Sequence, residues 1–174
     1  MSILPDILEP NLKVVFCGTA VSDESAARGH YYFEPSNSFW QLLHQAGFTP
    51  RQLRPDEDQS LPEFSIGMTD LVKAVSQSHD RNLDYSGARS VAAHIEAAAP
   101  SWVDFNGKTA GMAAAKALGH RKPSALGVAT FTIGQSNVFI LRSSTGANRG
   151  TSGLDGRATR VDWWAEFSGL AELA

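Results

Sequence analysis

Three short polar segments, each directly after a run of apolar residues, hold most of the side chains that could do chemistry. They are Gly18–Asp23, Asn106–Lys108 and Arg142–Arg149. Carboxylate, amide and hydroxyl groups can orient a water molecule, and arginines can hold phosphate groups as forked donors. Because ligands of an open α/β sheet bind beyond the carboxyl ends of its strands, the three segments predict one composite site.

The segments that must position these side chains alternate between strand and helix patterns. Short apolar runs predict strands at Leu12–Cys17, Ile66–Val72 (a strand or a turn), Trp102–Phe105, Thr130–Ile133 and Val138–Leu141. Helical spacing predicts helices over residues 37–46, 86–99, 108–118 and 157–174. The acidic, Pro-rich residues 49–63 are expected to form a surface excursion. The alternation predicts a single domain, residues 1–174, folded as a three-layer α/β/α sandwich around a central, mostly parallel sheet.

The composition is that of an ordinary globular protein, with 43% hydrophobic and 19% charged residues. Cys17 is the only cysteine, which excludes an internal disulfide and a thiolate metal site, and the five histidines are scattered without ligand spacing. We therefore expect no metal and no cofactor. No apolar stretch approaches the ~20 residues that span a bilayer, and the N-terminus shows no secretory signal, so we expect a cytoplasmic protein without a membrane partner.

The net charge of −3 hides a strong asymmetry along the chain. Residues 1–105 hold seven Lys and Arg against fourteen Asp and Glu, whereas residues 106–160 hold eight Lys and Arg against Asp155 alone. A basic second half can face the phosphates of a nucleic acid while the acidic remainder keeps the protein in solution. The alternative is an unevenly charged surface that contacts only solvent.

Five further segments occur in a characteristic order: Val14–Gly18, Pro35–Trp40, Gln45–Leu53, Gly67–Val72 and Phe105–Lys108. This ordered set resembles the uracil-DNA glycosylase superfamily, and most closely its mismatch-specific uracil and thymine-DNA glycosylase branch. The similarity covers most of the chain, from about residue 12 to residue 167. The resemblance implies an enzyme that flips a base out of DNA and hydrolyses its N-glycosidic bond.

Two motifs depart from that branch. Its first motif is a Gly-x-Asn-Pro-Gly loop whose Asn positions the attacking water, whereas Ala20 replaces this Asn here. Asp23, Glu24 and Asn37 are the possible replacements, and Asp23 and Asn37 are the favoured ones. The alternatives are a solvated loop position for Asp23 and a helix N-cap for Asn37. The last motif usually supplies a His or Asn that stabilises the departing base, and Ser143 stands at that position.

The resemblance also implies a set of residues around the flipped base: Thr19, Ala20, Tyr32, Phe33, Asp70 and Asn106. Tyr32 is expected to stack on the base, or else to pack beneath the first polar segment. Asp70 stands where relatives often carry an Asn that pairs with the base edge. Its carboxylate can accept from uracil N3–H but repels the O4 carbonyl, so either its pKa is raised or it binds the base differently. The alternatives are that Asp70 caps a helix or a turn and that Asn106 caps the next helix.

The last polar segment resembles the loop that wedges into the DNA duplex in the relatives. The residues expected to contact DNA are Lys108, Arg142, Ser144, Thr145, Gly146, Ala147, Asn148 and Arg149. Gly146 would let this loop approach DNA closely, and the two arginines would hold phosphates. The alternative is an ordinary turn rich in Gly and Ser.

These features predict a monomeric, monofunctional uracil-DNA glycosylase that acts on DNA containing uracil or another deaminated base. The first polar segment holds no lysine that could form a Schiff base, so an abasic site without a strand break is expected. A hypoxanthine-directed glycosylase and a non-catalytic damaged-DNA-binding module of the same fold remain as alternatives. The chain shows no phosphate-binding P-loop, no dinucleotide-binding glycine fingerprint and no Gly-x-Ser-x-Gly elbow, which argues against nucleotide-binding proteins and serine hydrolases.

Overall fold

A computed structural model describes residues 2–148 and 150–172 of the chain. Within these residues one sheet of five strands has the order β2-β1-β3-β5-β4. The strands are β1 (Val14–Gly18), β2 (Ile66–Asp70), β3 (Trp102–Asn106), β4 (Gly127–Ile133) and β5 (Ser136–Leu141). β1 pairs in parallel with β2 and β3, β3 pairs in parallel with β5, and β4 runs antiparallel to β5. Four carboxyl ends therefore meet at one edge of the sheet.

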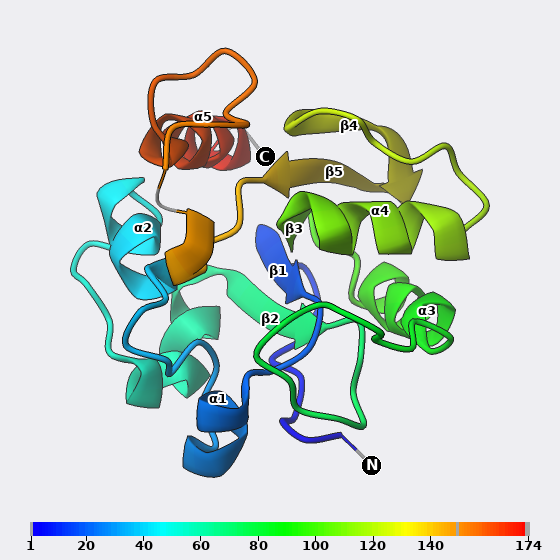
Figure 1. Cartoon of the computed structure of the whole chain (residues 1–174), viewed down its shortest axis with the longest axis horizontal. Helices are drawn as coiled ribbons and strands as arrows, with labels where there is room; N and C mark the ends of the chain where they lie inside the picture. The colour runs from blue at the N-terminus through cyan, green and yellow to red at the C-terminus, as the bar shows by residue number, and fades with distance from the viewer. Residues whose placement is uncertain (1, 149, 173–174) are drawn as a thin grey trace.

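Helices cover both faces of this sheet, as Figure 1 shows. α3 and α4 pack against each other on one face, and α2 and α5 pack against each other on the other. The α-helices are α1 (Asp23–Arg28), α2 (Phe39–Gln45), α3 (Ala88–Ala98), α4 (Lys108–Ala117) and α5 (Arg160–Glu172), and the 3-10 helices are η1 (Pro55–Phe64) and η2 (Gly146–Asn148). This arrangement confirms the predicted three-layer α/β/α sandwich. No helix in the described ranges has the length and apolar character needed to cross a membrane.

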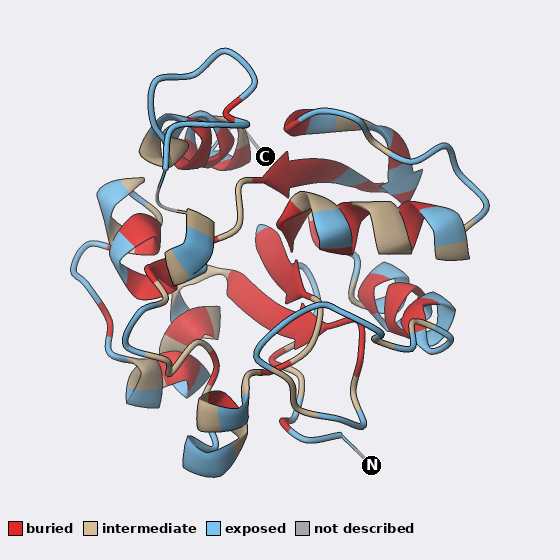
Figure 2. Cartoon of the chain, viewed as in Figure 1, coloured by how far each residue is buried: buried red, intermediate tan, exposed pale blue. Residues whose placement is uncertain are grey.

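Aromatic side chains fill the layer between the sheet and the α2/α5 pair. Phe16 of β1 stacks on Trp164 of α5 with ring centroids 5.6 Å apart, and it meets Phe39 of α2 edge-on at 5.4 Å. Phe139 of β5 stacks on Phe167 of α5 at 4.7 Å. Figure 2 shows β1, β2 and the inner helix faces as buried, whereas β4 is partly exposed. Each aromatic pair adds about 0.5–1.5 kcal/mol beyond area burial, so α2 and α5 are fixed firmly to the strands that carry the site.

Small residues let α4 approach the opposite face closely. A Cβ at Gly111 would lie 2.5 Å from Cδ1 of Ile140, so the helix could not sit as near with a larger residue. α4 begins directly after β3 through Gly107, whose φ of 121° is rarely adopted by any other residue. The start of α4 is therefore held at the carboxyl end of β3.

Two local predictions are wrong. Residues 49–63 are not only a surface excursion, because η1 buries Leu61 and the Asp58 carboxylate, which accepts from the backbone N–H of Tyr31 at 3.0 Å. Asp23 does not lie in an irregular loop but begins α1, with Ser22 as the N-cap. The sequence signal for this helix is weak, because the helix has only six residues and Ser22-x-x-Ser25 alone marks its start.

Gly67→Ala should destabilise the fold strongly. A Cβ at Gly67 would lie 2.5 Å from the carbonyl oxygen of Ile7, which is hydrogen-bonded to Met68 next to it. We expect a loss of about 1–3 kcal/mol in the free energy of unfolding by urea denaturation. Gly87→Ala, where a Cβ meets nothing within 4 Å, is the matched control and should change stability by under about 0.5 kcal/mol. Equal effects of the two substitutions would contradict this explanation.

Candidate functional site

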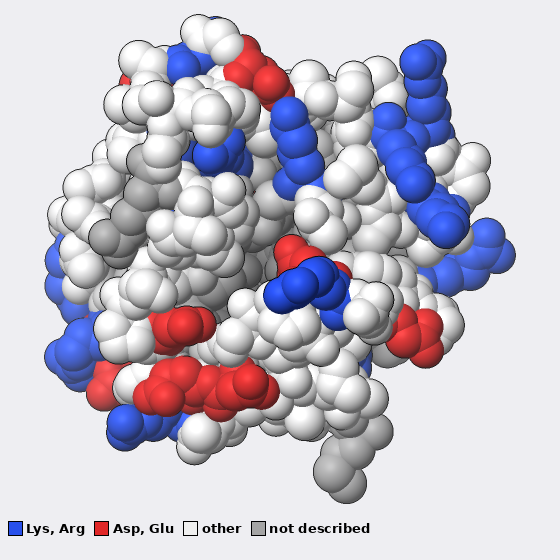
Figure 3. Space-filling model, in the orientation of Figure 1, with Lys and Arg blue, Asp and Glu red and all other residues white. Residues whose placement is uncertain are grey.

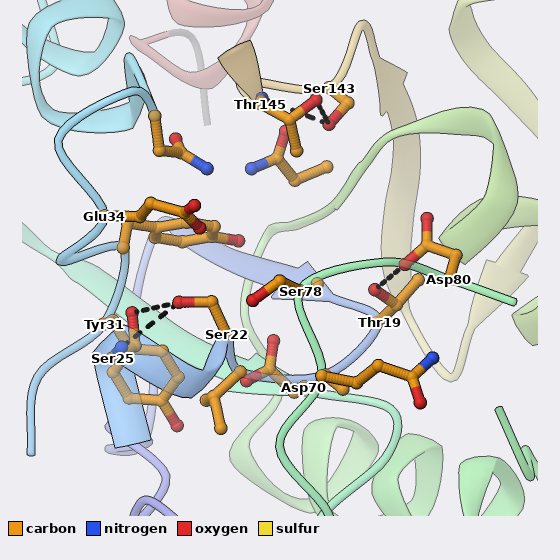
Figure 4. A pocket seen from close by; sticks show the side chains of 17 residues that line it. Thr19, Ser22, Ser25, Tyr31, Glu34, Asp70, Ser78, Asp80, Ser143 and Thr145 are labelled. Carbon is orange, nitrogen blue, oxygen red and sulfur yellow. Dashed lines mark hydrogen bonds between the residues drawn. The ribbon is translucent and has the colours of Figure 1, made fainter. Parts of the chain in front are cut away.

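A cavity of about 90 Å³ opens at the carboxyl edge of the sheet, where β1, β2 and β3 end. The three predicted segments contribute Gly18–Ser22, Asn106, Ser143 and Thr145 to its walls. Figure 4 shows Thr19, Ser22, Ser143 and Thr145 around a shared space, with Asp70 on the side opposite Ser143 and Thr145. The volume equals roughly three waters in the liquid, which suits one small planar ring and not a whole nucleotide.

Tyr32 forms an aromatic wall of this cavity. One face of its ring stacks on Phe39, with centroids 4.2 Å apart and planes 14° apart, and the residue lines the cavity. Its φ of 51° is unusual for a residue with a side chain, and strain of this kind is typical of functional positions. Its buried hydroxyl has no hydrogen-bond partner of good geometry within the described residues. Burial, followed by the Asp70 charge, raises the pKa of Tyr32 well above its usual value.

Asp70 provides a buried carboxyl group at the end of β2. Gly18 is its register partner on β1, and a Cβ at Gly18 would lie 2.5 Å from Asp70 Oδ1, so only glycine fits there. Burial raises the pKa of Asp70 to about 7, and the Asp6 charge adds to this; Lys73 and the Gly18 N–H act in the opposite direction. A substantial fraction of Asp70 is therefore protonated near neutral pH, and this form can donate a hydrogen bond into the cavity.

Asn106 binds the last polar segment and does not cap a helix. Its side-chain oxygen accepts from the backbone N–H of Ser144 at 3.0 Å, and its nitrogen donates to Ser144 Oγ at 2.9 Å. The N-cap of α4 is Gly107, so the predicted capping role is wrong. Ser144 is completely buried by this pair, which leaves it no surface for the predicted DNA contact.

Arg160 holds the same segment in place from the start of α5. Its Nη1 donates to the carbonyl oxygens of Ser143 and Thr145, both at 3.0 Å, and to that of Asn148 at 3.4 Å. Ser143 Oγ in turn accepts from the N–H of Thr145 at 3.3 Å. Sequence reasoning missed Arg160 because a single arginine at a helix start resembles any solvated charge.

The predicted DNA-contacting residues of this segment differ in exposure. Thr145 and Ala147 are exposed, whereas Gly146 and Asn148 are half-buried, and Arg149 lies outside the described residues. A Cβ at Gly146 would lie 3.0 Å from the carbonyl oxygen and Cβ of Ser36, so this glycine is already needed for packing within the protein.

The two candidates for the lost catalytic Asn lie in different places. Asp23 is exposed at the start of α1, accepts from Ser76 Oγ at 2.7 Å and does not line the cavity. Asn37 lines the cavity, and its side-chain oxygen accepts from the N–H of Phe39 at 3.0 Å. This bond to the first residue of α2 resembles the predicted N-cap role. The N-cap position itself is Ser38. Phe33 lines a neighbouring groove and lies 5.3 Å from the Arg28 guanidinium, outside the cavity.

The segment between β2 and α3 forms a wall that sequence reasoning missed. Gln77, Ser78 and Asp80 line the cavity from this segment. The N–H of Gln77 donates to the carbonyl oxygen of Val21 at 2.8 Å, and Thr19 Oγ1 donates to Asp80 Oδ1 at 2.5 Å. No spacing in residues 74–84 indicates this role, because the contact joins positions 61 residues apart.

A second cavity, of about 290 Å³, adjoins the first and shares Asp80, Asn106, Ser143 and Thr145 with it. Lys108 and Arg142 line it. Both already have partners, since Lys108 Nζ lies 2.9 Å from Asp155 Oδ2 and Arg142 Nη1 donates to the carbonyl oxygen of Ser152. Figure 3 shows further Lys and Arg side chains along α4 and the residues after it. No group of three or more metal-ligating side chains occurs in residues 2–148 and 150–172.

Arg160→Gln should loosen the last polar segment without unfolding the protein. Each charge-assisted hydrogen bond that is lost contributes about 1.5–3 kcal/mol, so hydrogen exchange at the amides of residues 143–148 should accelerate by at least ~10²-fold. Arg157→Gln, which removes an exposed Arg157–Glu166 ion pair, is the matched control and should leave these amides unchanged. Unchanged exchange in Arg160→Gln would show that Arg160 does not hold the segment.

Asp70→Asn should change stability in a pH-dependent way. Because the pKa of Asp70 is about 7 in the fold against an ordinary 3.8, its contribution is fully present below pH 3.8 and is lost as the pH rises through 7. The unfolding free energy of the wild type should thus fall relative to Asp70→Asn by about 4 kcal/mol between these limits, in urea denaturation. Asp84→Asn, at an exposed carboxylate whose pKa is lowered by the Ser86 N–H, should show no such fall. A constant difference between wild type and Asp70→Asn would mean that Asp70 is not desolvated.

Two comparisons with known proteins address the fold and the family of this chain. The solution NMR structure of a protein from Methanosarcina acetivorans, provisionally assigned as a uracil DNA glycosylase, shares the fold with a TM-score of 0.51. It is 22% identical, and the match covers 97% of this chain and 96% of that one, so it supports the fold alone. The family model of the uracil DNA glycosylase superfamily matches residues 5–168. Because this match spans nearly the whole chain, the protein belongs to the uracil DNA glycosylase superfamily.

Proposed function

We propose that this protein is a monofunctional DNA glycosylase that takes uracil, or a related deaminated base, into the cavity at the carboxyl edge of the sheet. It hydrolyses the N-glycosidic bond and leaves an abasic site. One observation carries the proposal: an aromatic wall, backed by Phe39, stands beside a buried carboxyl group in a cavity the size of a single ring. We further propose that residues 1–174 act as one domain and as a monomer in the cytoplasm.

The cavity can hold a flipped base by stacking and by its edge. The ring of Tyr32, supported from behind by Phe39, can stack on the base. A protonated Asp70 can donate to a carbonyl of the base and accept from the neighbouring ring N–H. Uracil and hypoxanthine both present this carbonyl and N–H side by side, whereas cytosine and adenine present an amino group beside an unprotonated ring nitrogen.

The leaving base requires stabilisation of negative charge. Ser143 lines the cavity, and Arg160 fixes the backbone around it without entering the cavity lining. A preorganised donor at this position contributes on the order of 10²–10³ in rate. Ser143→Ala is therefore expected to slow base release, while the aromatic wall and Asp70 remain in place.

We propose that DNA binds at the second cavity and at the exposed residues beside it. Lys108 and Arg142 line that cavity, so phosphates would compete with Asp155 and the Ser152 carbonyl for them. These internal partners make the two cations less available to phosphates than the charge of this half of the chain alone would suggest. We therefore expect DNA affinity to fall less steeply with salt concentration than it would if both cations were free.

The test is incubation with duplex oligonucleotides that carry uracil, hypoxanthine or a thymine mismatch, followed by alkaline cleavage. We expect release of uracil, hypoxanthine or both, no strand break before alkali, and no borohydride-trapped adduct. No release from any of the three substrates, with retained binding to damaged DNA, would favour the non-catalytic module.

The pH dependence tests the role of Asp70. Because protonated Asp70 is the donor to the base carbonyl and its pKa is about 7, single-turnover release should fall as the pH rises through 7. Asp70→Asn keeps a donor at every pH, so its rate should vary little between pH 6 and 8. Parallel pH profiles of the two proteins would contradict base recognition by protonated Asp70.

A further inference from the structure

Hydrolysis needs a group that takes a proton from the attacking water, and the cavity holds few candidates. The first motif lacks even the Asn that would position this water, since Ala20 stands in its place. Asn37 lines the cavity, but an amide cannot accept a proton near neutral pH. The carboxyl groups that line the cavity are Glu34, Asp70 and Asp80. Asp70 is the buried carboxyl group that we assign to the base edge. Glu34 and Asp80 therefore remain as candidates for the group that accepts the proton.

The two remaining carboxylates occupy different positions relative to a nucleotide. Glu34 lines the base cavity and the groove on its outer side with Phe33. Asp80 lines both the base cavity and the second cavity, where Lys108 and Arg142 lie. The sugar of a flipped nucleotide joins its base to its phosphate. A group at the junction of the two cavities is therefore the one nearest the glycosidic carbon.

The first loop orients Asp80 toward that junction. Thr19 Oγ1 donates to Asp80 Oδ1 at 2.5 Å, and the Gln77–Val21 backbone bond at 2.8 Å fixes the same segment to the loop beside Ala20. Figure 4 shows the Thr19–Asp80 pair on the side of the cavity opposite Glu34. Thr19 uses its hydroxyl hydrogen on one carboxylate oxygen, which leaves Asp80 Oδ2 free to accept from a water.

We propose that Asp80, oriented by Thr19, is the catalytic carboxylate that replaces the missing Asn of the first motif; this inference rests on the proposed glycosylase function. The C1′–N bond breaks and its electron pair stays with the base, whose negative charge Ser143 stabilises. The water oxygen forms a bond to C1′, and its proton passes to Asp80. The base anion takes a proton from solvent, and Asp80 returns its proton to solvent. The carboxylate also stabilises the positive charge that develops on the sugar.

The experiment compares single-turnover base release by wild type, Asp80→Asn, Thr19→Val and Asp84→Asn. Asp80→Asn keeps an acceptor for Thr19 and should lower the rate at least ~10²-fold with unchanged DNA affinity and thermal midpoint. Thr19→Val removes only the orienting bond and should lower the rate about 3- to 10-fold. Asp84→Asn is the matched control: it removes the same charge from the same segment, and its side-chain oxygen can still accept from the Ser86 N–H.

The outcomes separate the two proposals. Wild-type release with an Asp80→Asn rate within about 3-fold of wild type would overturn the role of Asp80 and leave the glycosylase function intact. A large loss in Glu34→Gln with a normal Asp80→Asn would move the role to Glu34. Absence of release by the wild type from every substrate would overturn both proposals.

Discussion

The candidate site depends on one buried contact, the pair of hydrogen bonds between the side chain of Asn106 and Ser144. These bonds join the end of β3 to the loop after β5. The two strands pair along the sheet, and the chain segments that follow them would otherwise separate beyond its edge. Without them, a buried amide would lose its partners at a cost of about 1–3 kcal/mol. Ser143 and Thr145 flank Ser144, so the same two bonds help to hold both residues at the cavity. Arg160 then fixes the same loop from the other side.

A second constraint is the burial of charge beside the cavity. Asp70 lies at the end of a parallel strand with Gly18 directly opposite, so no side chain separates it from the ligand space. The same desolvation that raises its pKa makes its neutral form a hydrogen-bond donor. Nearby, Lys108 forms an ion pair with Asp155, so its positive charge is partly neutralised but still contributes to the basic surface. The site thus combines Asp70, which is readily protonated near neutral pH, with cations such as Lys108 that already have partners.

The fold could be predicted from sequence because its signals are local. Short apolar runs closed by Gly18 and Gly107 indicate the parallel strands, and the ordered motifs indicate the superfamily, which the family match confirms. The site could be predicted only in part. That the three segments meet follows from strand order, and Tyr32, Asp70 and Asn37 do line the cavity. Asp80 and Arg160 could not be predicted, because their contacts join distant positions without a periodic pattern, and Asn106 has a partner that only the tertiary structure shows.

The most direct test of the base site is hydrogen exchange of the protein with and without a duplex that carries a non-cleavable uracil nucleotide. We expect slower exchange at the backbone amides of residues 18–22, 77–80 and 143–148, all at the carboxyl edge of the sheet. Exchange should be unchanged at the opposite edge, around residues 12–13 and 101–102. Protection at that opposite edge, or no protection around the cavity despite DNA binding, would contradict the assignment of the cavity as the base site.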